Sequence, residues 1–426
     1  MTNRSAEPGQ RASDEAERLL LRRERFGMRF GLDRIHRLLN VLGLARIPFP
    51  SIEIVGTNGK SSTTRLTTAL LERHGLRTGC FTSPHLLSYR ERIRVGEADI
   101  APERFAATVA QVVRAADLVD RSQTDADDRV TQFELLTAAA LVEFAAAQVD
   151  VAVLEAGLGG RYDATNAVDS GVAVLTNVGL EHTRYLGPTV ADIAREKLAV
   201  VRPGSTLIIG PAIDPVAREI ALRTAAERGA TLVEVEDEPS ADFELAARGA
   251  YQRGNFAVAR AAAQAFLGRE LDPAAVLAAA HSVSVPGRFE VHDGQPQVLF
   301  DGAHNPGGID ALTASLPEFV AGRRLVAVVS ILDDKDAAAM LRGLLAHVDA
   351  LVCTACASPR ALPAPTLASL AGQLGAAEVV IEQRPHDAMV KAGELAGPDG
   401  VVLATGSIYL LADLMRDAGA APGSTL

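Results

Sequence analysis

Residues 51–64 read Ser-Ile-Glu-Ile-Val-Gly-Thr-Asn-Gly-Lys-Ser-Ser-Thr-Thr, and this stretch decides the fold. The apolar run at its start predicts a buried strand, and the segment from Gly56 to Gly59 predicts a sharp turn. We expect a helix from Lys60 to Arg73, because Gly75 suits its C-terminal cap. Backbone N–H groups and the helix N-terminus of such a turn face an anion, and Lys60 adds a point charge. The stretch therefore predicts binding of a nucleotide phosphate.

The turn before Lys60 is shorter than a usual P-loop. The full Gly-x-x-x-x-Gly-Lys motif would place a glycine at residue 54, where this chain has isoleucine. A plain strand-to-helix turn with a surface lysine is therefore the alternative. The strand before the turn and the helix after it favour the phosphate-binding interpretation.

The composition is that of an ordinary globular enzyme with more than one domain. The chain has 426 residues, 48% of them hydrophobic and 22% charged, and its formal net charge is −11. This length exceeds a single core, and the acidic balance argues against a general nucleic-acid binder. No segment approaches the ~18 apolar residues of a spanning helix, and residues 1–17 contain no signal-peptide core. We expect a soluble, cytoplasmic protein that binds no nucleic acid and no membrane.

The chain has three cysteines, a sparse and odd set that fits a reducing compartment. Cys353 and Cys356 have the spacing of a redox or zinc motif. No second cysteine pair or nearby histidine completes a zinc site, so we interpret them as buried or strand-end thiols.

Polar side chains directly follow several predicted strands. The apolar run at residues 150–155 ends in Glu155, the run at residues 171–178 is followed by His182, and Ser83 follows a short strand. The carboxyl ends of parallel strands meet at one sheet edge, beside the phosphate loop. A magnesium ligand is expected there, and Glu155 is placed to be one. Each of these residues alone also has a common explanation as a turn or strand-end residue.

A glycine-rich segment at residues 156–166 contains Arg161, Asp163 and Asn166. Its glycines cost backbone entropy that an ordinary connection would not need, which favours a functional loop. The spacing after Gly157 and Gly159 does not fit a dinucleotide-binding fingerprint.

Two other features have good structural explanations. Thr131 and Glu134 have the spacing of a capping box at the start of an alanine-rich helix. Lys197, in a helix expected at residues 191–201, has by spacing alone the character of a solvated lysine.

Strands alternate with helices to the end of the chain, which predicts parallel sheets covered by helices on both faces. We expect a P-loop NTPase-like α/β domain followed by a smaller Rossmann-like α/β domain. The boundaries are an N-terminal extension at residues 1–28, partly disordered, a phosphate-binding domain at residues 29–291 and the second domain at residues 292–426. A hinge is expected near Pro286 and Gly287.

Taken in order, these motifs resemble the Mur ligase superfamily, and more specifically the folylpolyglutamate synthase/dihydrofolate synthase family. The resemblance extends from about residue 29 to residue 411, and it rests on the order of the motifs more than on any one of them. The motifs are Gly-Thr-Asn-Gly-Lys-Ser-Ser (56–62), Thr-Ser-Pro-His (82–85), Leu-Glu-Ala-Gly-Leu-Gly-Gly-Arg-Tyr-Asp-Ala-Thr-Asn (154–166), Gly-Leu-Glu-His (179–182), Glu-Lys (196–197), Pro-Gly-Arg-Phe-Glu (286–290), Asp-Gly-Ala-His-Asn-Pro (301–306) and Thr-Gly-Ser-Ile-Tyr-Leu (405–410).

The resemblance implies an ATP phosphate loop and further nucleotide contacts. The loop residues are Gly56, Thr57, Asn58, Gly59, Lys60, Ser61 and Ser62. The other nucleotide contacts are Asn255, Arg288, Asp301 and His304. The family commonly has glycine directly after the lysine, where this chain has serine, which leaves open whether Ser61 or Ser62 faces the metal.

The resemblance also implies two magnesium ions and a substrate site. The magnesium ligands would be Ser83, Glu155, His182 and a carbamylated Lys197, which helps to hold the second ion; Lys60, His182 and Lys197 are the implied catalytic residues. The dihydropteroate ring would be bound by Thr131, Gln132, Phe133 and Glu134. Gly159, Arg161 and Asp163 would lie at the pterin and metal end.

The implied reaction is an ATP-dependent ligation. Independently of the resemblance, we expect a monomer, because no exposed amphipathic seam stands out in the sequence. ATP phosphorylates a carboxylate of dihydropteroate or a reduced folate, and the amine of L-glutamate then displaces phosphate from the acyl phosphate. Closure at the hinge would exclude water from this intermediate.

Two other functions compete with this interpretation. One is a Mur-type amide ligase that acts on a different acid. A cell-wall version with its own N-terminal nucleotide-sugar domain would need far more chain before the phosphate loop. The other is a P-loop ATPase that is not a ligase, which would not require Glu155, His182 and His304 together.

Overall fold

The chain forms two compact units. The computed structural model describes residues 8–24, 29–122, 128–211, 213–236 and 244–416. The first unit comprises Met1–His85, Tyr89–Glu244 and Gly254–Val283, and the second comprises Leu86–Ser88, Leu245–Arg253 and Ser284–Leu426. Among the described helices, none is long and apolar enough to cross a lipid bilayer.

The first unit is built on an eight-stranded sheet in the order β4-β3-β2-β5-β1-β6-β7-β8. Neighbouring strands are parallel from β2 to β8, and β3 and β4 extend the β2 edge in antiparallel fashion. All residues of β1, β2, β5 and β6 are buried, as expected for parallel strands covered on both faces. The strands are β1 Ser51–Val55, β2 Thr78–Phe81, β3 Ile93–Val95, β4 Ala98–Asp99, β5 Val151–Glu155, β6 Val172–Leu175, β7 Thr206–Ile209 and β8 Thr231–Glu234.

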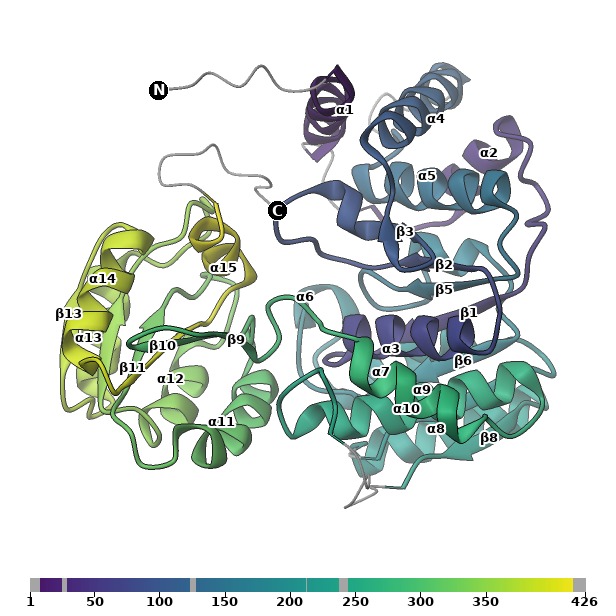
Figure 1. Ribbon diagram of the computed structural model, residues 1–426. Coiled ribbons are helices and arrows are strands. Elements are labelled where there is room, and N and C mark those ends of the chain that lie inside the picture. The colour runs from purple at the N-terminus through teal and green to yellow at the C-terminus, as the bar shows by residue number, and fades with distance from the viewer. Residues whose placement is uncertain (1–7, 25–28, 123–127, 212, 237–243, 417–426) are drawn as a thin grey trace. The chain divides into compact units, whose positions relative to one another are not determined.

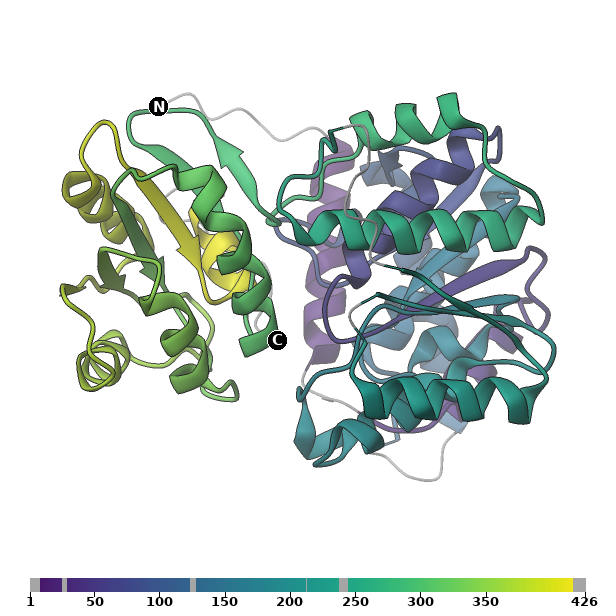
Figure 2. The ribbon, with the colours of Figure 1, turned by 90° about the horizontal axis from the view of Figure 1, so that it is seen from below.

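Helices cover both faces of this sheet (Figures 1 and 2). Helix α3 has the predicted limits, Lys60–Arg73, and packs on β1, β2 and β5. The other helices are α1 Pro8–Glu24, α2 Asp33–Val41, η1 Tyr89–Arg92, α4 Pro102–Ser122, α5 Gln132–Ala147, η2 Ala164–Ala167, α6 Thr183–Leu186, α7 Val190–Lys197, η3 Leu198–Val200, α8 Pro215–Arg228, α9 Tyr251–Leu267 and α10 Pro273–Ser282.

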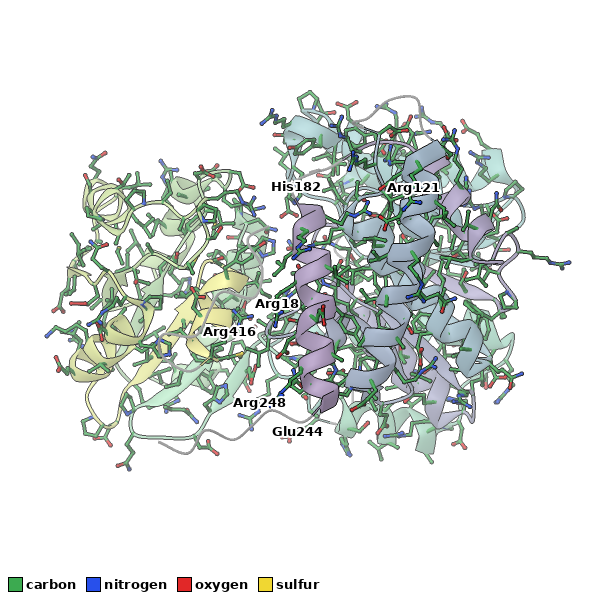
Figure 3. The ribbon with its side chains drawn as sticks, turned by 90° about the horizontal axis from the view of Figure 1, so that it is seen from above. Arg18, Arg121, His182, Glu244, Arg248 and Arg416 are labelled. Carbon is green, nitrogen blue, oxygen red and sulfur yellow. The ribbon has the colours of Figure 1, made fainter. Side chains whose placement is uncertain are left out.

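The N-terminal extension, predicted to be partly disordered, contains a helix that the sequence analysis did not predict. Residues 1–7 lie outside the described part, but α1 is a helix that packs against α4; Figure 3 labels Arg18 on α1 and Arg121 on α4. Ala16 and Leu20 are buried in the same core cluster as the helices of the first unit. The prediction weighed the polar composition of the segment and overlooked this apolar face at helical spacing.

We expect Leu20→Ala to lower the free energy of unfolding by about 2–5 kcal/mol, because it leaves a cavity in a packed core. Leu20 is 1% exposed, whereas Leu118 on α4 is 55% exposed. Leu118→Ala is therefore the control and should change stability by no more than about 0.5 kcal/mol. Urea unfolding of both variants measures the difference. Equal midpoints for Leu20→Ala and the unmodified protein would contradict the packing of α1.

The second unit contains a six-stranded sheet in the order β13-β12-β11-β14-β10-β9, parallel except for the edge strand β9. Its strands are β9 Glu290–His292, β10 Gln297–Phe300, β11 Leu325–Val329, β12 Ala350–Cys353, β13 Val379–Ile381 and β14 Val401–Thr405. Its helices are α11 Pro306–Val320, α12 Ala337–Leu345, α13 Ala364–Gln373, α14 Pro385–Ala396 and α15 Ile408–Leu414. The two sheet-containing α/β units confirm the predicted fold class.

The second unit differs from the predicted segment 292–426, because it begins at Ser284 and takes in two short segments from earlier in the chain. The Arg416 guanidinium donates to the carbonyl oxygens of Leu86 and Leu87 (Figure 3 labels Arg416). The backbone N–H of Ala250 donates to Ser315 Oγ at 2.9 Å. Hydrogen bonds between residues so far apart in the chain cannot be predicted from local sequence patterns.

Candidate active site

The phosphate loop leaves the sheet at its centre, where β1 lies between β5 and β6. Gly59 has φ +81° and precedes the first residue of α3. A Cβ atom there would lie 2.4 Å from Asn255 Oδ1, and one at Gly56 would lie 1.8 Å from Thr176 Oγ1. Both positions therefore require glycine, and Asn255, a predicted nucleotide contact, lies against the loop.

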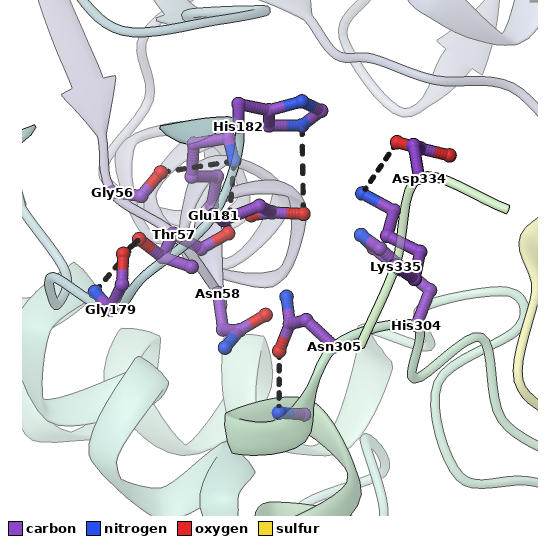
Figure 4. A network of polar contacts seen from close by, with 12 residues as sticks. Gly56, Thr57, Asn58, Gly179, Glu181, His182, His304, Asn305, Asp334 and Lys335 are labelled. Carbon is purple, nitrogen blue, oxygen red and sulfur yellow. Dashed lines mark hydrogen bonds and ion pairs between the residues drawn. The ribbon is translucent and has the colours of Figure 1, made fainter. Parts of the chain in front are cut away.

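Two residues that the sequence analysis missed hold the loop. Thr176 Oγ1 donates to the carbonyl oxygen of Asn58 at 2.6 Å, and the N–H of Asn58 donates to Asn177 Oδ1 at 2.9 Å. Thr57 Oγ1 accepts from the N–H of Gly179 at 3.0 Å (Figure 4). Thr176 and Asn177 directly follow the buried parallel strand β6, and this position could have marked them in the sequence as candidate site residues. These hydrogen bonds hold the loop through contacts of the chain itself.

Lys60 lies over this loop. Its ammonium donates to the carbonyl oxygens of Gly56 and Thr57 at 3.1 and 3.2 Å. The lysine begins α3, so its charge adds to the partial positive charge of a 14-residue helix's N-terminus. This arrangement suits the phosphate groups of a nucleotide.

Ser61, Ser83 and Glu155 form one cluster of oxygen atoms. Ser61 Oγ donates to Glu155 Oε1 at 2.8 Å, and the N–H of Ser83 donates to Glu155 Oε2 at 3.0 Å. The Glu155 side chain is buried, and it ends β5 as predicted. Of the two serines left open by the sequence, Ser61 is the one that points to this carboxylate.

Lys197 is buried, so its interpretation as a solvated lysine from spacing alone is wrong. It ends α7, and its Nζ donates to the carbonyl oxygen of Gly56 at 2.7 Å. Burial, together with the nearby charge of Lys60, lowers the pKa of Lys197 to about 7. Near neutral pH a large fraction of this amine is therefore uncharged.

His182 follows β6 as predicted and adopts a left-handed conformation with φ 51°. Its Nε2 lies 3.6 Å from Glu181 Oε1 (Figure 4). The described contacts place His182 beside this carboxylate, a neighbour that the sequence analysis did not select.

The glycine-rich segment packs against α7. Arg161 forms an ion pair with Glu196 at 3.1 Å, and a Cβ atom at Gly160 would lie 2.6 Å from the carbonyl oxygen of Lys197. Gly159 has φ +70°. Asp163 is buried and accepts from the backbone N–H of Leu158 at 2.8 Å. These contacts fix the conformation of the glycine-rich segment and its position against α7.

The segment from Thr131 to Glu134 forms the predicted capping box at the start of α5. Glu134 also accepts from Arg34 at 3.1 Å, and Gln132 donates to the hydroxyl of Tyr89 at 2.9 Å. Phe133 lies beside Gly157, where a Cβ atom would be 2.6 Å from its ring. The polar side chains of this segment thus have structural partners, and its role in substrate binding stays a prediction.

Three exposed aromatic rings that the sequence analysis missed lie close to one another. The ring of Phe30 is 5.8 Å from that of Tyr162 and 6.2 Å from that of Tyr185. All three side chains are more than 40% exposed, although large apolar groups are usually buried. The ring of Phe30 is inclined at 63° to that of Tyr162 and at 58° to that of Tyr185, so the three rings form an exposed edge-to-face apolar cluster.

In the second unit, the predicted residues gather at the carboxyl end of β10. Asp301 accepts from the Tyr251 hydroxyl at 2.7 Å and from the N–H groups of Phe289 and Ala303 at 2.9 Å each. Burial raises the pKa of Asp301. Arg288 donates to the carbonyl oxygen of Gly287 at 3.0 Å, and His304 Nδ1 lies 2.8 Å from that of Gly302.

The chain is similar to known proteins over nearly its whole length. The Mur ligase middle domain matches residues 54–264, and the glutamate ligase domain of Mur ligases matches residues 287–408. A Mycobacterium tuberculosis protein named dihydrofolate synthase/folylpolyglutamate synthase is 37% identical over 80% of this chain and 77% of its own length.

Solved structures give the same result. The Mycobacterium tuberculosis folylpolyglutamate synthase complexed with ADP has a TM-score of 0.89 at 34% identity, over 97% of this chain and all of the other. A bifunctional folylpolyglutamate synthase/dihydrofolate synthase with Mn, AMPPNP and L-glutamate bound has a TM-score of 0.81 at 31% identity, over 94% of this chain and 97% of the other. On the agreement of motifs, fold and these similarities, the chain belongs to the folylpolyglutamate synthase/dihydrofolate synthase family of Mur ligases.

Proposed function

We propose that the protein is an ATP-dependent ligase that joins L-glutamate to the carboxylate of dihydropteroate, to the glutamate chain of reduced folates, or to both. The observation that supports this most is the pairing of a preformed phosphate loop with the Ser61–Ser83–Glu155 cluster beside it. A phosphate loop alone would suit any ATPase. Relatives that match 80% and 94% of the chain are named as synthases of this kind.

The oxygen cluster suits Mg²⁺. The Ser61 hydroxyl and the buried Glu155 carboxylate are the hard oxygen donors that this ion prefers. We propose that Ser83, Glu155 and His182 hold it, with Ser61 beside them. When bound, the ion would offset negative charge on the transferring phosphoryl group. The chain's own contribution is to position the nucleotide through Lys60 and the loop amides, and so to favour the in-line attack of the substrate carboxylate.

Lys197 has the properties that carbamylation requires. The uncharged amine attacks CO₂, one amine proton is released to water, and a carbamate with a single negative charge results. We propose that this carbamate helps to hold a second Mg²⁺. Burial of the side chain supports this in two ways, because it lowers the pKa of Lys197 to about 7 and would shield a carbamate from hydrolysis.

The remaining predicted residues keep their proposed roles. Asn255, Arg288, Asp301 and His304 are proposed nucleotide contacts, and Thr131 to Glu134 a proposed pterin-binding segment. We propose a monomer in the cytoplasm; the three cysteines are buried and unpaired, which fits a reducing compartment. Sedimentation measures the oligomeric state.

We propose that Phe30, Tyr162 and Tyr185 bind the aromatic part of the acceptor. Stacking on an aromatic ring contributes about 0.5–1.5 kcal/mol beyond the burial of area. Tyr162→Ala should therefore raise KM for the acceptor by about 2- to 12-fold and leave KM for ATP unchanged. Steady-state phosphate release measures both constants. Leu222→Ala, an exposed apolar residue on α8, is the control. An unchanged acceptor KM in Tyr162→Ala would contradict the assignment.

The proposed function is tested by phosphate release from the purified protein with MgATP and glutamate. Dihydropteroate and tetrahydrofolate are compared as acceptors. Release with both establishes a bifunctional enzyme, and release with one names the activity. Release with neither would overturn the folate substrate and favour a ligase for another acid. ATP hydrolysis that needs neither acceptor nor glutamate would indicate an ATPase.

A further inference from the structure

Two buried carboxyl groups share one hydroxyl group beneath the glycine-rich segment. Thr165 Oγ1 lies 2.8 Å from Glu53 Oε1 and 2.7 Å from Asp163 Oδ1. Glu53 and Thr165 are fully buried, and Asp163 is 6% exposed. Glu53 belongs to β1, the strand that leads into the phosphate loop, whereas Asp163 and Thr165 belong to the loop at residues 156–166.

The geometry fixes a proton count. A hydroxyl group has one hydrogen, so Thr165 donates to only one of the two carboxyl groups. The contact with the other is a hydrogen bond only if that carboxyl group is itself protonated and donates. One of the two carboxyl groups in the cluster is therefore protonated.

The surroundings place this proton on Glu53. Asp163 also accepts from the N–H groups of Leu158 at 2.8 Å and Thr165 at 3.1 Å, which favours its ionised form. Glu53 Oε2 has no hydrogen-bond partner within the described part of the chain. An ionised carboxylate in that position would be unsolvated, whereas a neutral acid there costs far less.

Other groups around Glu53 do not reverse this assignment. The β-strand neighbours that pair with Glu53 are Leu154 and Ala173, which are apolar. The charge of Arg202 favours the ionised form of Glu53 only by long-range electrostatic attraction, because its guanidinium is bound to Asn166 and Asp169. Burial raises the pKa of Glu53 to about 8; burial also raises the pKa of Asp163, against the effect of its backbone bonds.

We propose that Glu53 is a positioning residue that holds a proton at neutral pH and donates it in a hydrogen bond to Thr165, which in turn donates to ionised Asp163. Asp163 then fixes Leu158 and the rest of the segment. The same segment packs through Gly160 on the backbone of Lys197, so its position bears on the proposed metal-holding lysine. The effect on catalysis rests on the proposed function, whereas the proton on Glu53 does not.

Loss of this proton should disorder the segment. Above the pKa of Glu53 a second negative charge would face Asp163, and Thr165 could serve only one of the two. The direction in which stability changes with pH follows from the protons that the folded and unfolded states bind. Between pH 4.5 and 8 the folded state keeps a proton that the unfolded state has released, so stability falls as the pH rises through this window.

The decisive variant is Glu53→Gln, whose amide N–H replaces the carboxyl O–H as a donor to Thr165 and cannot ionise. The rate of phosphate release by the unmodified protein should fall above pH 8, by about tenfold at pH 9 for a single titration. Glu53→Gln should keep the rate at pH 7 and lose this alkaline fall. Glu72→Gln is the matched control, because Glu72 also accepts from a threonine, Thr78, and lies outside the glycine-rich segment. It should keep the alkaline fall.

A readout without catalysis separates this proposal from the proposed function. The stability of Glu53→Gln relative to the unmodified protein, measured by urea unfolding, should increase steadily from pH 4.5 to 8. Thr165→Val should lower phosphate release at all pH values, and Thr165→Ser should restore it. A stability difference that does not change with pH, or an alkaline fall that persists in Glu53→Gln, would overturn the proposal. Absence of phosphate release in every variant would overturn only the function.

Discussion

Lys197→Ala is expected to lower the rate of phosphate release by at least about a hundredfold, the scale of losing one electrostatic contact to a transferring group. The protein should stay folded. The amine lies at the end of a short helix and donates to a single backbone carbonyl group, that of Gly56. Its removal therefore breaks one hydrogen bond in the phosphate loop and takes away the group proposed to hold the second metal ion.

The pH and CO₂ dependence of the unmodified protein should reflect the same group. With a pKa of about 7, the amine becomes more reactive towards CO₂ as the pH rises from 6 to 8, so activity should rise over this range. Removal of bicarbonate should lower it. The same pKa also fixes the direction in which the stability of the protein changes with pH. The unfolded state binds the extra proton between pH 7 and 10.5, so this lysine's contribution to stability rises with pH across that window.

Phosphate release and far-UV circular dichroism of Lys197→Ala measure the two expected effects. Lys391→Ala is the control, because Lys391 is an exposed lysine paired with Glu394 in the second unit. Acetate, a small carboxylate, should restore part of the activity. Full activity of Lys197→Ala at ordinary bicarbonate would contradict both the carbamate and the role of this residue.

Glu155→Gln is the second substitution with a large expected effect, a loss of roughly 10²–10³-fold in phosphate release. The amide keeps the volume of the side chain but removes the negative charge that a hard cation needs. Its NH₂ group would also face either the N–H of Ser83 or the hydroxyl of Ser61, which donate to Glu155 now. The cluster would therefore lose both its charge and its geometry.

Titration of phosphate release with MgCl₂ measures this loss. The activity of Glu155→Gln should rise only at Mg²⁺ concentrations well above those that saturate the unmodified protein. Glu143→Gln is a matched control, since Glu143 is another buried acid in the same unit, paired with Arg104 on the helical layer. An unchanged magnesium requirement in Glu155→Gln would exclude this carboxylate as a ligand.

The sequence by itself determined the local elements and their order. The limits of α3, the strand that ends in Glu155 and the capping box of α5 all follow from side-chain periodicity and end signals within a few residues. The order of the motifs identified the family. These features are encoded locally because hydrogen bonds in helices and caps join residues that are close in the chain.

Only the tertiary structure decided which side chains meet. The bond of Lys197 to Gly56 spans 141 positions, that of Ser61 to Glu155 spans 94, and that of Thr165 to Glu53 spans 112. Spacing along a helix could not separate a buried Lys197 from a solvated one. The burial that shifts its pKa and holds a proton on Glu53 arises only when distant segments exclude water from these groups, because desolvation depends on the whole surrounding fold.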